Sequence, residues 1–287
     1  MINMRKVMAA GALVALSYVA VADNLPTAAV FDNGSLDTLA ALGLQEVVVG
    51  VPKQGLPAYL ALYNNARYTD VGGLKNPDIE AIKALTPSYI LITGRQGDKK
   101  ADLEAIGTVK QVGVTGDNYW GGLSEHITSV AALFHAEKAS EAALADLKAA
   151  IDSAKEGIEG EPMALAVTHN NGFFSLRTEP VIEQLLNVKS PAIPVGVEPQ
   201  TRGARTFTPL SVVDIVAMKP DALFIIDRSA AIGNAEASLD VEALKADLAA
   251  QGGESINVVY LTPKLWYLSG NGLQSVRMQI EEVTKAL

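Results

Sequence analysis

Apolar residues recur every three or four positions in the middle of the chain, between residues 137 and 157. At this spacing Leu144, Leu147, Ile151 and Ala154 fall on one stripe of a helix. The stretch contains no proline, and its one glycine is its last residue. Roughly 20 helical residues span about 30 Å, the diameter of a small domain. We therefore predict one long helix here, to which an ordinary amphipathic surface helix is the alternative.

Short, continuous apolar runs lie on both sides of this helix and alternate with helical patterns. Runs typical of buried strands are found at residues 28–32, 46–51, 89–93, 109–114, 163–170, 222–227 and 256–262. Residues 189–208 are expected to form a long loop. Strands of this kind that alternate with helices predict parallel sheets covered on both faces. The predicted fold class is α/β, with two Rossmann-like lobes that contain parallel sheets and are joined by one long helix.

The beginning of the chain has the pattern of an export signal. Arg5 and Lys6 form a positive start, an apolar run follows, and residues 20–22 (Ala-Val-Ala) match a small-x-small cleavage site. A membrane anchor is the alternative, but the run is shorter than the roughly 20 residues that a spanning helix needs. The expected organisation is a signal peptide at 1–22, an N-terminal lobe at 23–123, connecting helices at 124–160 and a C-terminal lobe at 161–287.

Composition narrows the class of protein further. The chain is 49% apolar and 19% charged, as expected for a globular protein, and it has no cysteine for a lipid anchor or a disulfide. Its net charge of -9 becomes -11 without residues 1–22, because this segment contains Arg5 and Lys6 and no acid. Such a charge argues against nucleic acid and acidic membranes as partners. We expect a soluble monomer in a bacterial periplasm.

One spacing is repeated in the two halves of the chain. Arg95 stands eight positions after Pro87, and Arg228 stands eight positions after Pro220. In both halves the proline precedes an apolar strand, so each arginine follows the carboxyl end of a buried strand, the edge where open α/β sheets bind ligands. A chance match is the alternative, since a single loop arginine is usually only solvated. The equal spacing favours a cleft with one arginine on each wall.

Motifs of catalysis are absent from the sequence. There is no cysteine nucleophile, no G-x-S-x-G elbow, no P-loop and no G-x-G-x-x-G motif. His126, His135 and His169 lack the spacing of metal ligands, and we expect them to be surface or capping histidines. A binding protein is therefore favoured over an enzyme.

Arginine is the residue type that stands out at predicted loop positions. These arginines are Arg95, Arg177, Arg202, Arg205 and Arg228. In a protein that is acidic overall, they predict an anionic ligand, because guanidinium stays charged and offers planar paired donors.

Aromatic residues are the other candidates for ligand contacts. Tyr267 follows the last predicted strand, and its phenolate oxygen is a hard donor that suits ferric iron, although core packing is an equal alternative. Trp120 and Trp266 offer rings for stacking on an aromatic ligand, although tryptophans more commonly pack in the core.

Several longer runs carry a resemblance to a known family. FDNGSLDTLAALGL, VPKQGLPAYL and VGGLKNPDIEAIKALTPSYILITGRQ in the first half, with KPDALFIIDRSAAIGN and LWYLSGNGLQS in the second, resemble the periplasmic siderophore-binding proteins of ABC importers. The likeness is closest to the members that take up ferric catecholates and covers nearly all of the chain after residue 22. It implies a fold of two α/β lobes joined by one long helix, as the apolar pattern also suggests.

The resemblance implies roles for single residues. Arg95, Arg177 and Arg228 match the arginine triad that holds a catecholate complex, and Tyr267 matches a tyrosine that completes the coordination of iron. The histidine partner of that tyrosine lies in a T-H-G sequence, whereas residues 201–203 here read T-R-G. Arginine does not coordinate iron, because it does not deprotonate.

The T-R-G departure leaves two interpretations open. Arg202 and Arg205 would add charge for a more anionic ligand, or another residue would reach the metal. The resemblance implies no intrinsic cofactor, since ferric iron arrives within the bound siderophore.

Transporter docking is also implied by the resemblance, through one acidic residue in each lobe. Glu80, seven positions before Pro87, matches the family's docking glutamate. The corresponding position before Pro220 is Val213, with Asp214 beside it, and a solvated helix face is the alternative for both acids. The expected partners are a ferric siderophore and an inner-membrane ABC permease. A protein that binds haem or another anionic metal chelate is the first alternative, and a periplasmic enzyme is the second.

Overall fold

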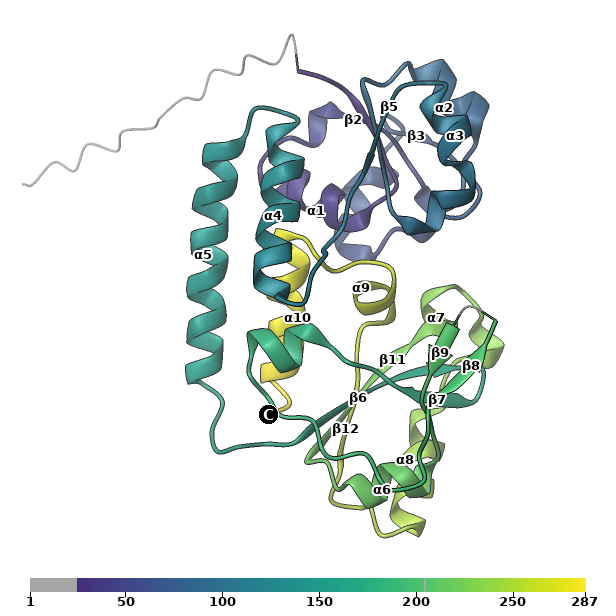
Figure 1. Ribbon diagram of the computed structural model, residues 1–287, viewed down its shortest axis with the longest axis vertical. Helices are drawn as coiled ribbons and strands as arrows, with labels where there is room; N and C mark the ends of the chain where they lie inside the picture. The colour runs from purple at the N-terminus through teal and green to yellow at the C-terminus, as the bar shows by residue number, and fades with distance from the viewer. Residues whose placement is uncertain (1–24, 204) are drawn as a thin grey trace, which may run out of the picture.

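The computed structural model describes residues 25–203 and 205–287, which form two α/β lobes beside a layer of long helices (Figure 1). The predicted signal peptide at residues 1–22 lies outside the described residues. No helix in the described part of the chain is both long and apolar enough to cross a membrane.

The N-terminal lobe is built on a parallel sheet with the strand order β3-β2-β1-β4-β5. The strands are β1 (Ala28–Val30), β2 (Val48–Val51), β3 (Thr69–Asp70), β4 (Tyr89–Ile92) and β5 (Thr108–Gln111). Side chains alternate across β1, so that Ala28 and Val30 pack on one face while Ala29 and Phe31 pack on the other. Both faces are therefore buried, as the continuous apolar runs predict.

Helices cover the two faces of this first sheet. On one face lies α1 (Asn33–Ala41), and on the other lie α2 (Ile79–Leu85) and α3 (Lys100–Glu104). Short 3-10 helices complete the lobe: η2 (Gln45–Val47), η3 (Lys53–Gly55), η4 (Ala58–Asn64) and η5 (Gly94–Lys99).

The C-terminal lobe has a mixed sheet with the order β10-β7-β6-β11-β12. Its strands are β6 (Ala164–Asn170), β7 (Phe173–Leu176), β10 (Pro209–Leu210), β11 (Ala222–Asp227) and β12 (Asn257–Tyr260). The expected parallel arrangement is found for β6, β11 and β12, whereas β7 runs antiparallel to β6 and makes this sheet mixed. Asn171 and Gly172, with φ of 51° and 80°, form the two-residue turn between them, and Asn-Gly is the sequence that such a turn prefers.

The predicted loop at residues 189–208 contains a small hairpin. β8 (Gln200–Arg202) pairs antiparallel with β9 (Arg205–Phe207), apart from the main sheet. The strands are only three residues long and exposed, so they leave no apolar run in the sequence. The remaining elements of the lobe are the π-helical turn η6 (Val181–Leu185), α6 (Val212–Met218), α7 (Arg228–Ala231), η7 (Ala235–Ala237), α8 (Val241–Ala250) and α9 (Pro263–Tyr267).

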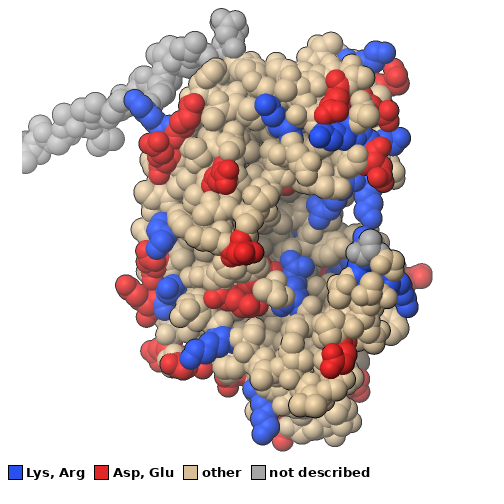
Figure 2. Space-filling model, in the orientation of Figure 1, with Lys and Arg blue, Asp and Glu red and all other residues tan. Residues whose placement is uncertain are grey.

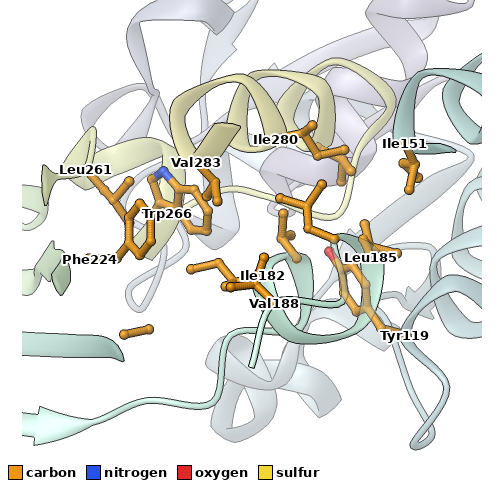
Figure 3. Packing of buried hydrophobic residues seen from close by; sticks show 14 of the residues in the cluster. Tyr119, Ile151, Ile182, Leu185, Val188, Phe224, Leu261, Trp266, Ile280 and Val283 are labelled. Atoms are coloured by element: carbon orange, nitrogen blue, oxygen red, sulfur yellow. The ribbon is translucent and has the colours of Figure 1, made fainter. Parts of the chain in front are cut away.

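Long helices join the two lobes. α4 (Tyr119–Ala132) leads into α5 (Glu137–Glu156), which agrees with the predicted helix at 137–157 to within one residue. The C-terminal helix α10 (Leu273–Thr284) packs against α5 and also against α1 of the N-terminal lobe. Figure 3 shows the apolar cluster of this layer, where Tyr119 of α4 and Ile151 of α5 share a core with Ile280 of α10.

A buried carboxylate fastens α10 to the N-terminal lobe. Asp37 of α1 accepts the backbone N–H groups of Gln274 (2.9 Å) and Ser275 (2.6 Å), in the first turn of α10. Burial raises the pKa of Asp37 from 3.8 to about 6, against the effect of these hydrogen bonds. This single residue therefore links α1 to α10.

Candidate functional site

Arginines from the two lobes meet at one tyrosine. Tyr267 is the last residue of α9, which lies between the lobes in Figure 1. Nη2 of Arg95 donates to its backbone oxygen at 3.1 Å, and Nε of Arg228 donates to its hydroxyl at 2.7 Å. Figure 2 shows a hollow between the lobes with Lys and Arg side chains on its margin. The repeated spacing in the sequence thus corresponds to two arginines on either side of Tyr267.

Arg95 follows β4 in a short-range turn. Thr93 precedes η5 and accepts the N–H of Arg95 at 3.2 Å, while the Gln96 side chain accepts the N–H of Thr93 at 2.8 Å. This capping box explains why the chain leaves the strand here. The Arg95 side chain is exposed, and its bond to Tyr267 is its one hydrogen bond among the described residues.

Arg228 is held at more points. It is the first residue of α7, directly after β11, and is partly buried. Besides its bond to Tyr267, Nη1 donates to Oδ1 of Asn170 at 2.8 Å, and the guanidinium carbon lies 5.6 Å from the centre of the Tyr267 ring. The last distance is within the range of a cation–π interaction.

A fully buried carboxylate supports this second arginine. Asp227 caps α7 by accepting the N–H of Ala230 at 3.2 Å. It also accepts the N–H of Leu239 (2.7 Å) and the Tyr260 hydroxyl (3.0 Å), and lies 3.1 Å from Nδ1 of His169. Burial favours the neutral acid, but the Leu239 N–H and the other donors outweigh it and lower the pKa of Asp227. The ionised carboxylate of Asp227 thus joins the end of β11 to β6, α7 and β12 through hydrogen bonds.

The histidines differ from the expectation of surface positions. His169 and His126 are buried beside Asp227 and Asp32, whereas His135 is exposed as predicted. Each buried ring also accepts a backbone N–H, His126 from Gly113 and His169 from Gly172, both at 3.2 Å. Both rings therefore accept a backbone N–H, as a capping histidine does. The prediction of a surface position is wrong for these two histidines, each of which packs beside an aspartate that follows a strand or ends it.

Arg177 follows β7 and is paired inside its own lobe. Its Nε donates to Oε2 of Glu179 at 2.7 Å. Burial raises the pKa of Glu179, and the nearby positive charge of Arg177 opposes this rise. The local carboxylate offsets part of the charge that Arg177 would offer to an anionic ligand, in contrast to Arg228.

Arg202 and Arg205 face each other across the β8–β9 hairpin and are exposed. Within the described residues neither guanidinium makes a hydrogen bond or an ion pair. The T-R-G sequence at residues 201–203 thus lies on this hairpin.

The tryptophans belong to the core. Trp266 is buried in the apolar cluster (Figure 3). Its Nε1 donates to Glu282 of α10 at 2.7 Å. Trp120, in the first turn of α4, is partly buried against the same apolar cluster. Trp266 nevertheless directly precedes Tyr267, which places an intrinsic fluorophore beside the arginine pair.

The expected docking acids occupy different surroundings. Glu80 is exposed in the first turn of α2, and Val213, at the same place in α6, is 58% exposed. Asp214 is partly buried and closes a capping box, since its Oδ2 accepts the Ser211 hydroxyl at 2.6 Å and the Ser211 N–H at 2.8 Å. These bonds lower the pKa of Asp214. Asp214 is therefore engaged in its own helix, unlike Glu80.

A large cavity lies elsewhere, in the C-terminal lobe. It has a volume of about 1070 Å³, and its lining includes Phe173, Val195 and Asp214 but neither the arginine pair nor Tyr267. The described residues contain no group of three His, Cys, Asp or Glu side chains placed to hold a metal ion.

Sequence reasoning missed the residues that hold the segment around Tyr267. Asn33 Nδ2 donates to the Leu268 oxygen at 2.8 Å, and the Tyr59 hydroxyl bonds to that of Ser269. Asn33 and Tyr59 belong to runs that carry the family resemblance, but no local pattern shows that they reach a segment more than 200 residues away. Asn170 was also missed, although it immediately precedes the Asn-Gly turn signal.

Comparison with known proteins identifies the family to which most of the chain is similar. A family model described as a periplasmic binding protein matches residues 29–264. The petrobactin-binding protein YclQ of Bacillus subtilis (strain 168) is 32% identical over 265 residues, which cover 90% of this chain and 81% of that protein.

Solved structures agree with this match. The crystal structure of YclQ from Bacillus subtilis has a TM-score of 0.79 and 31% identity, over 91% of this chain and 92% of that chain. PiuA, the substrate-binding protein of an iron uptake ABC transporter from Streptococcus pneumoniae, has a TM-score of 0.78 and 30% identity, over 91% and 93%. The siderophore-binding protein BauB, bound to two acinetobactin molecules and ferric iron, has a TM-score of 0.73 and 25% identity, over 92% and 93%. The predicted two-lobe α/β fold is confirmed.

Proposed function

The chain belongs to the periplasmic binding protein family, and from this premise we propose that it captures a ferric siderophore of the catecholate or mixed catecholate type. In this proposal the protein binds its ligand in the periplasm, carries no intrinsic cofactor and delivers the iron complex to an inner-membrane ABC permease. The names of its relatives, one of which binds petrobactin, support the class of ligand.

One observation carries the proposal, namely the pair of arginines on either side of Tyr267. Arg95 follows a strand end of the N-terminal lobe and Arg228 follows one of the C-terminal lobe, and both contact the same residue. A ferric catecholate complex is anionic, and guanidinium groups from two walls would hold it by charge-assisted hydrogen bonds. Three further arginines are proposed to add to this positive charge, namely Arg177, Arg202 and Arg205. Trp120 is proposed to contact the ligand.

Tyr267 is proposed as the protein's own oxygen donor to ferric iron. Its hydroxyl lies against the positive charge of Arg228, and a phenolate is a hard donor. In the T-R-G sequence Arg202 replaces the expected histidine partner. A tetradentate siderophore leaves two coordination positions of ferric iron free, and in this proposal the protein would fill one of them, through Tyr267. This role predicts a ligand-to-metal absorption band with a tetradentate siderophore that is lost in Tyr267→Phe.

Docking on the permease is proposed to use Glu80 in the N-terminal lobe. On α6 the corresponding contact would come from the neighbourhood of Asp214 and the exposed Val213. The two lobes would then contribute unequally, because the Asp214 carboxylate is already engaged by Ser211.

Fluorescence titration of the mature protein tests the ligand class. Trp266 adjoins Tyr267, so a bound iron complex should quench it. We expect quenching by hexadentate and tetradentate ferric catecholates and none by a ferric hydroxamate or haem. Quenching by haem or the hydroxamate alone would mean that the lobes carry a different metal chelate, and no quenching by any of the four would contradict the proposal.

Charge variants test the arginine pair. Arg95→Ala and Arg228→Ala should each weaken catecholate binding by about 1.5 to 3 kcal/mol, the range for a hydrogen bond to a charged group. Arg67→Ala is the matched control, because Arg67 is an N-terminal-lobe arginine paired with Glu46 on the exposed surface. Equal affinities in all three variants would remove the electrostatic argument.

A further inference from the structure

The guanidinium of Arg228 is fixed at two of its three nitrogens. Nε donates to the Tyr267 hydroxyl at 2.7 Å and Nη1 donates to Oδ1 of Asn170 at 2.8 Å. A planar group held at two nitrogens does not turn about its terminal bonds, so the direction of its remaining N–H groups is set. Among the described residues Nη2 has no partner, which leaves it as the donor for a ligand.

From this geometry we infer that Asn170 is a positioning residue, which orients Arg228 toward the anionic ligand without cancelling its charge. The inference rests on the proposed function, in which Arg228 binds the siderophore. Arg228 donates here, so the amide must present its oxygen rather than its NH₂ group. An amide oxygen accepts as a carboxylate does but has no net charge.

Arg177 shows the effect of a charged acceptor, a carboxylate in place of an amide oxygen. Its Nε is held by the carboxylate of Glu179 at 2.7 Å, so part of its charge is matched within the protein. Arg228 donates a similar hydrogen bond to a neutral acceptor, the Asn170 amide oxygen, which does not match its charge. The nature of the acceptor therefore separates an arginine that is available to an anion from one that is partly neutralised.

Asn170 is itself held in place by the turn that follows it. Gly172 donates its N–H to Nε2 of His169 at 3.2 Å, and Asn171 donates its N–H to Oγ of Ser229 at 3.0 Å. Ser229 adjoins Arg228, and His169 is joined to Asp227 on its other side. The β6–β7 turn and the start of α7 are thus one bonded unit, which sets the distance between Asn170 and Arg228.

Side chains alternate along β6, so the neighbours His169 and Asn170 have opposite surroundings. His169 is 2% exposed, whereas Asn170 is exposed. Substitution of Asn170 therefore removes one hydrogen bond and creates no core cavity, and we expect Asn170→Ala to fold with an unchanged melting temperature.

The test compares Asn170→Ala with Asn170→Asp by tryptophan quenching with a hexadentate ferric catecholate. Loss of the acceptor should weaken binding about 3- to 10-fold, because Arg228 regains its rotational freedom. The aspartate should hold Arg228 at least as firmly and yet weaken binding more, by about 10- to 100-fold, because it neutralises the arginine. A residue with only a structural role would show the reverse order. Asn64→Ala and Asn64→Asp are the controls, since Asn64 is an exposed asparagine of the N-terminal lobe whose side chain makes no hydrogen bond to the described residues.

A double-mutant cycle with Arg228→Ala separates the inference from the proposed function. In the Arg228→Ala background, Asn170→Ala should change the affinity less than about twofold, because its effect passes through the arginine. If Arg228→Ala weakens binding but Asn170→Ala does not, or if the Asn170→Ala loss persists undiminished without the arginine, the positioning role is wrong and the proposed function stands. If Arg228→Ala itself has no effect, the arginine cleft fails, and the role of Asn170 fails with it.

Discussion

Arg95 and Arg228 occupy the same place in the sequence of their lobes, but their anchoring differs. Each stands eight positions after a proline that precedes a buried strand. Arg95 is exposed and leaves its strand through a neutral capping box of Thr93 and Gln96. Arg228 is partly buried, is bonded at two nitrogens and follows the fully buried carboxylate of Asp227.

The difference shows that one spacing can produce two kinds of binding group. Arg228 is oriented before any ligand arrives, so little side-chain entropy is lost when it binds. Arg95 has one bond, to the Tyr267 backbone, and is able to follow ligands of different size. We expect the C-terminal lobe to define the position of the bound anion and the N-terminal lobe to adapt to it.

The two capping residues offer the largest test of this contrast. Asp227→Ala should lower the free energy of unfolding by about 3–5 kcal/mol, because it removes the partner of the buried His169 ring together with the acceptor of the Leu239 N–H. Thr93→Ala removes one exposed-turn cap and should cost only about 1 kcal/mol. Urea denaturation of both variants measures the difference, and equal losses would mean that the two turns are anchored alike.

Acid titration of stability distinguishes Asp227 from Asp37, two buried carboxylates that cap helices. The pKa of Asp227 is lowered, so the ionised carboxylate stabilises the folded state above pH 4. This stabilisation is lost as the pH falls and the carboxylate is protonated. The pKa of Asp37 is raised from 3.8 to about 6, so the folded state binds a proton more tightly than the unfolded state does. Protonated Asp37 therefore favours folding at low pH, and this stabilisation is lost as the pH rises from 4 to above 6. The rise in the pKa of Asp37 corresponds to a decrease of about 3 kcal/mol in the free energy of unfolding between pH 4 and a pH above 6.

Denaturation midpoints between pH 3 and pH 7 measure this contrast. Relative to the wild type, Asp37→Asn should gain stability toward pH 7, and Asp227→Asn should lose less of its stability toward pH 3. Parallel curves for the wild type and Asp37→Asn would contradict the raised pKa of Asp37.

Lysine substitutions sharpen the comparison at the level of binding. Arg228→Lys keeps the charge but cannot bond Tyr267 and Asn170 together in the plane of a guanidinium, and we expect a loss of affinity of about tenfold. Arg95→Lys removes one hydrogen bond and should lower the affinity about threefold, since a flexible lysine side chain still brings its positive charge to the bound anion. Calorimetric titration with one ferric catecholate measures both variants. A larger loss for Arg95→Lys would reverse the roles of the two lobes.

Much of the fold was accessible from the sequence, because it depends on patterns within single segments. The stripe of α5 and the apolar runs of the parallel strands predicted their elements closely. The hairpin of β8 and β9 was not found, because its strands are short and exposed. The antiparallel β7 was also missed, although the Asn-Gly pair at residues 171–172 signalled the turn before it.

The candidate site divides in the same way. Spacing indicated that Arg95 and Arg228 follow strand ends, and the structure brings both to Tyr267. Spacing could not show that Glu179 pairs with Arg177 while a neutral amide holds Arg228, because these partners depend on tertiary contacts. The distinction between a neutralised and an available arginine therefore appears only in three dimensions.

The smallest predicted effect concerns the ends of α2 and α6, the helices that precede the two arginine-bearing strands. Both end in a left-handed residue that is not glycine, Thr86 with φ of 46° and Lys219 with φ of 50°. This conformation is unfavourable for any side chain and most unfavourable for a β-branched one such as threonine. Thr86→Gly should therefore stabilise the protein by up to about 1 kcal/mol and Lys219→Gly by about half as much. Chemical denaturation of the two variants measures this order. Because both residues are exposed and precede their strands by several positions, ligand affinity should stay unchanged; an altered affinity in Thr86→Gly would indicate that the N-terminal arginine turn responds to strain in α2.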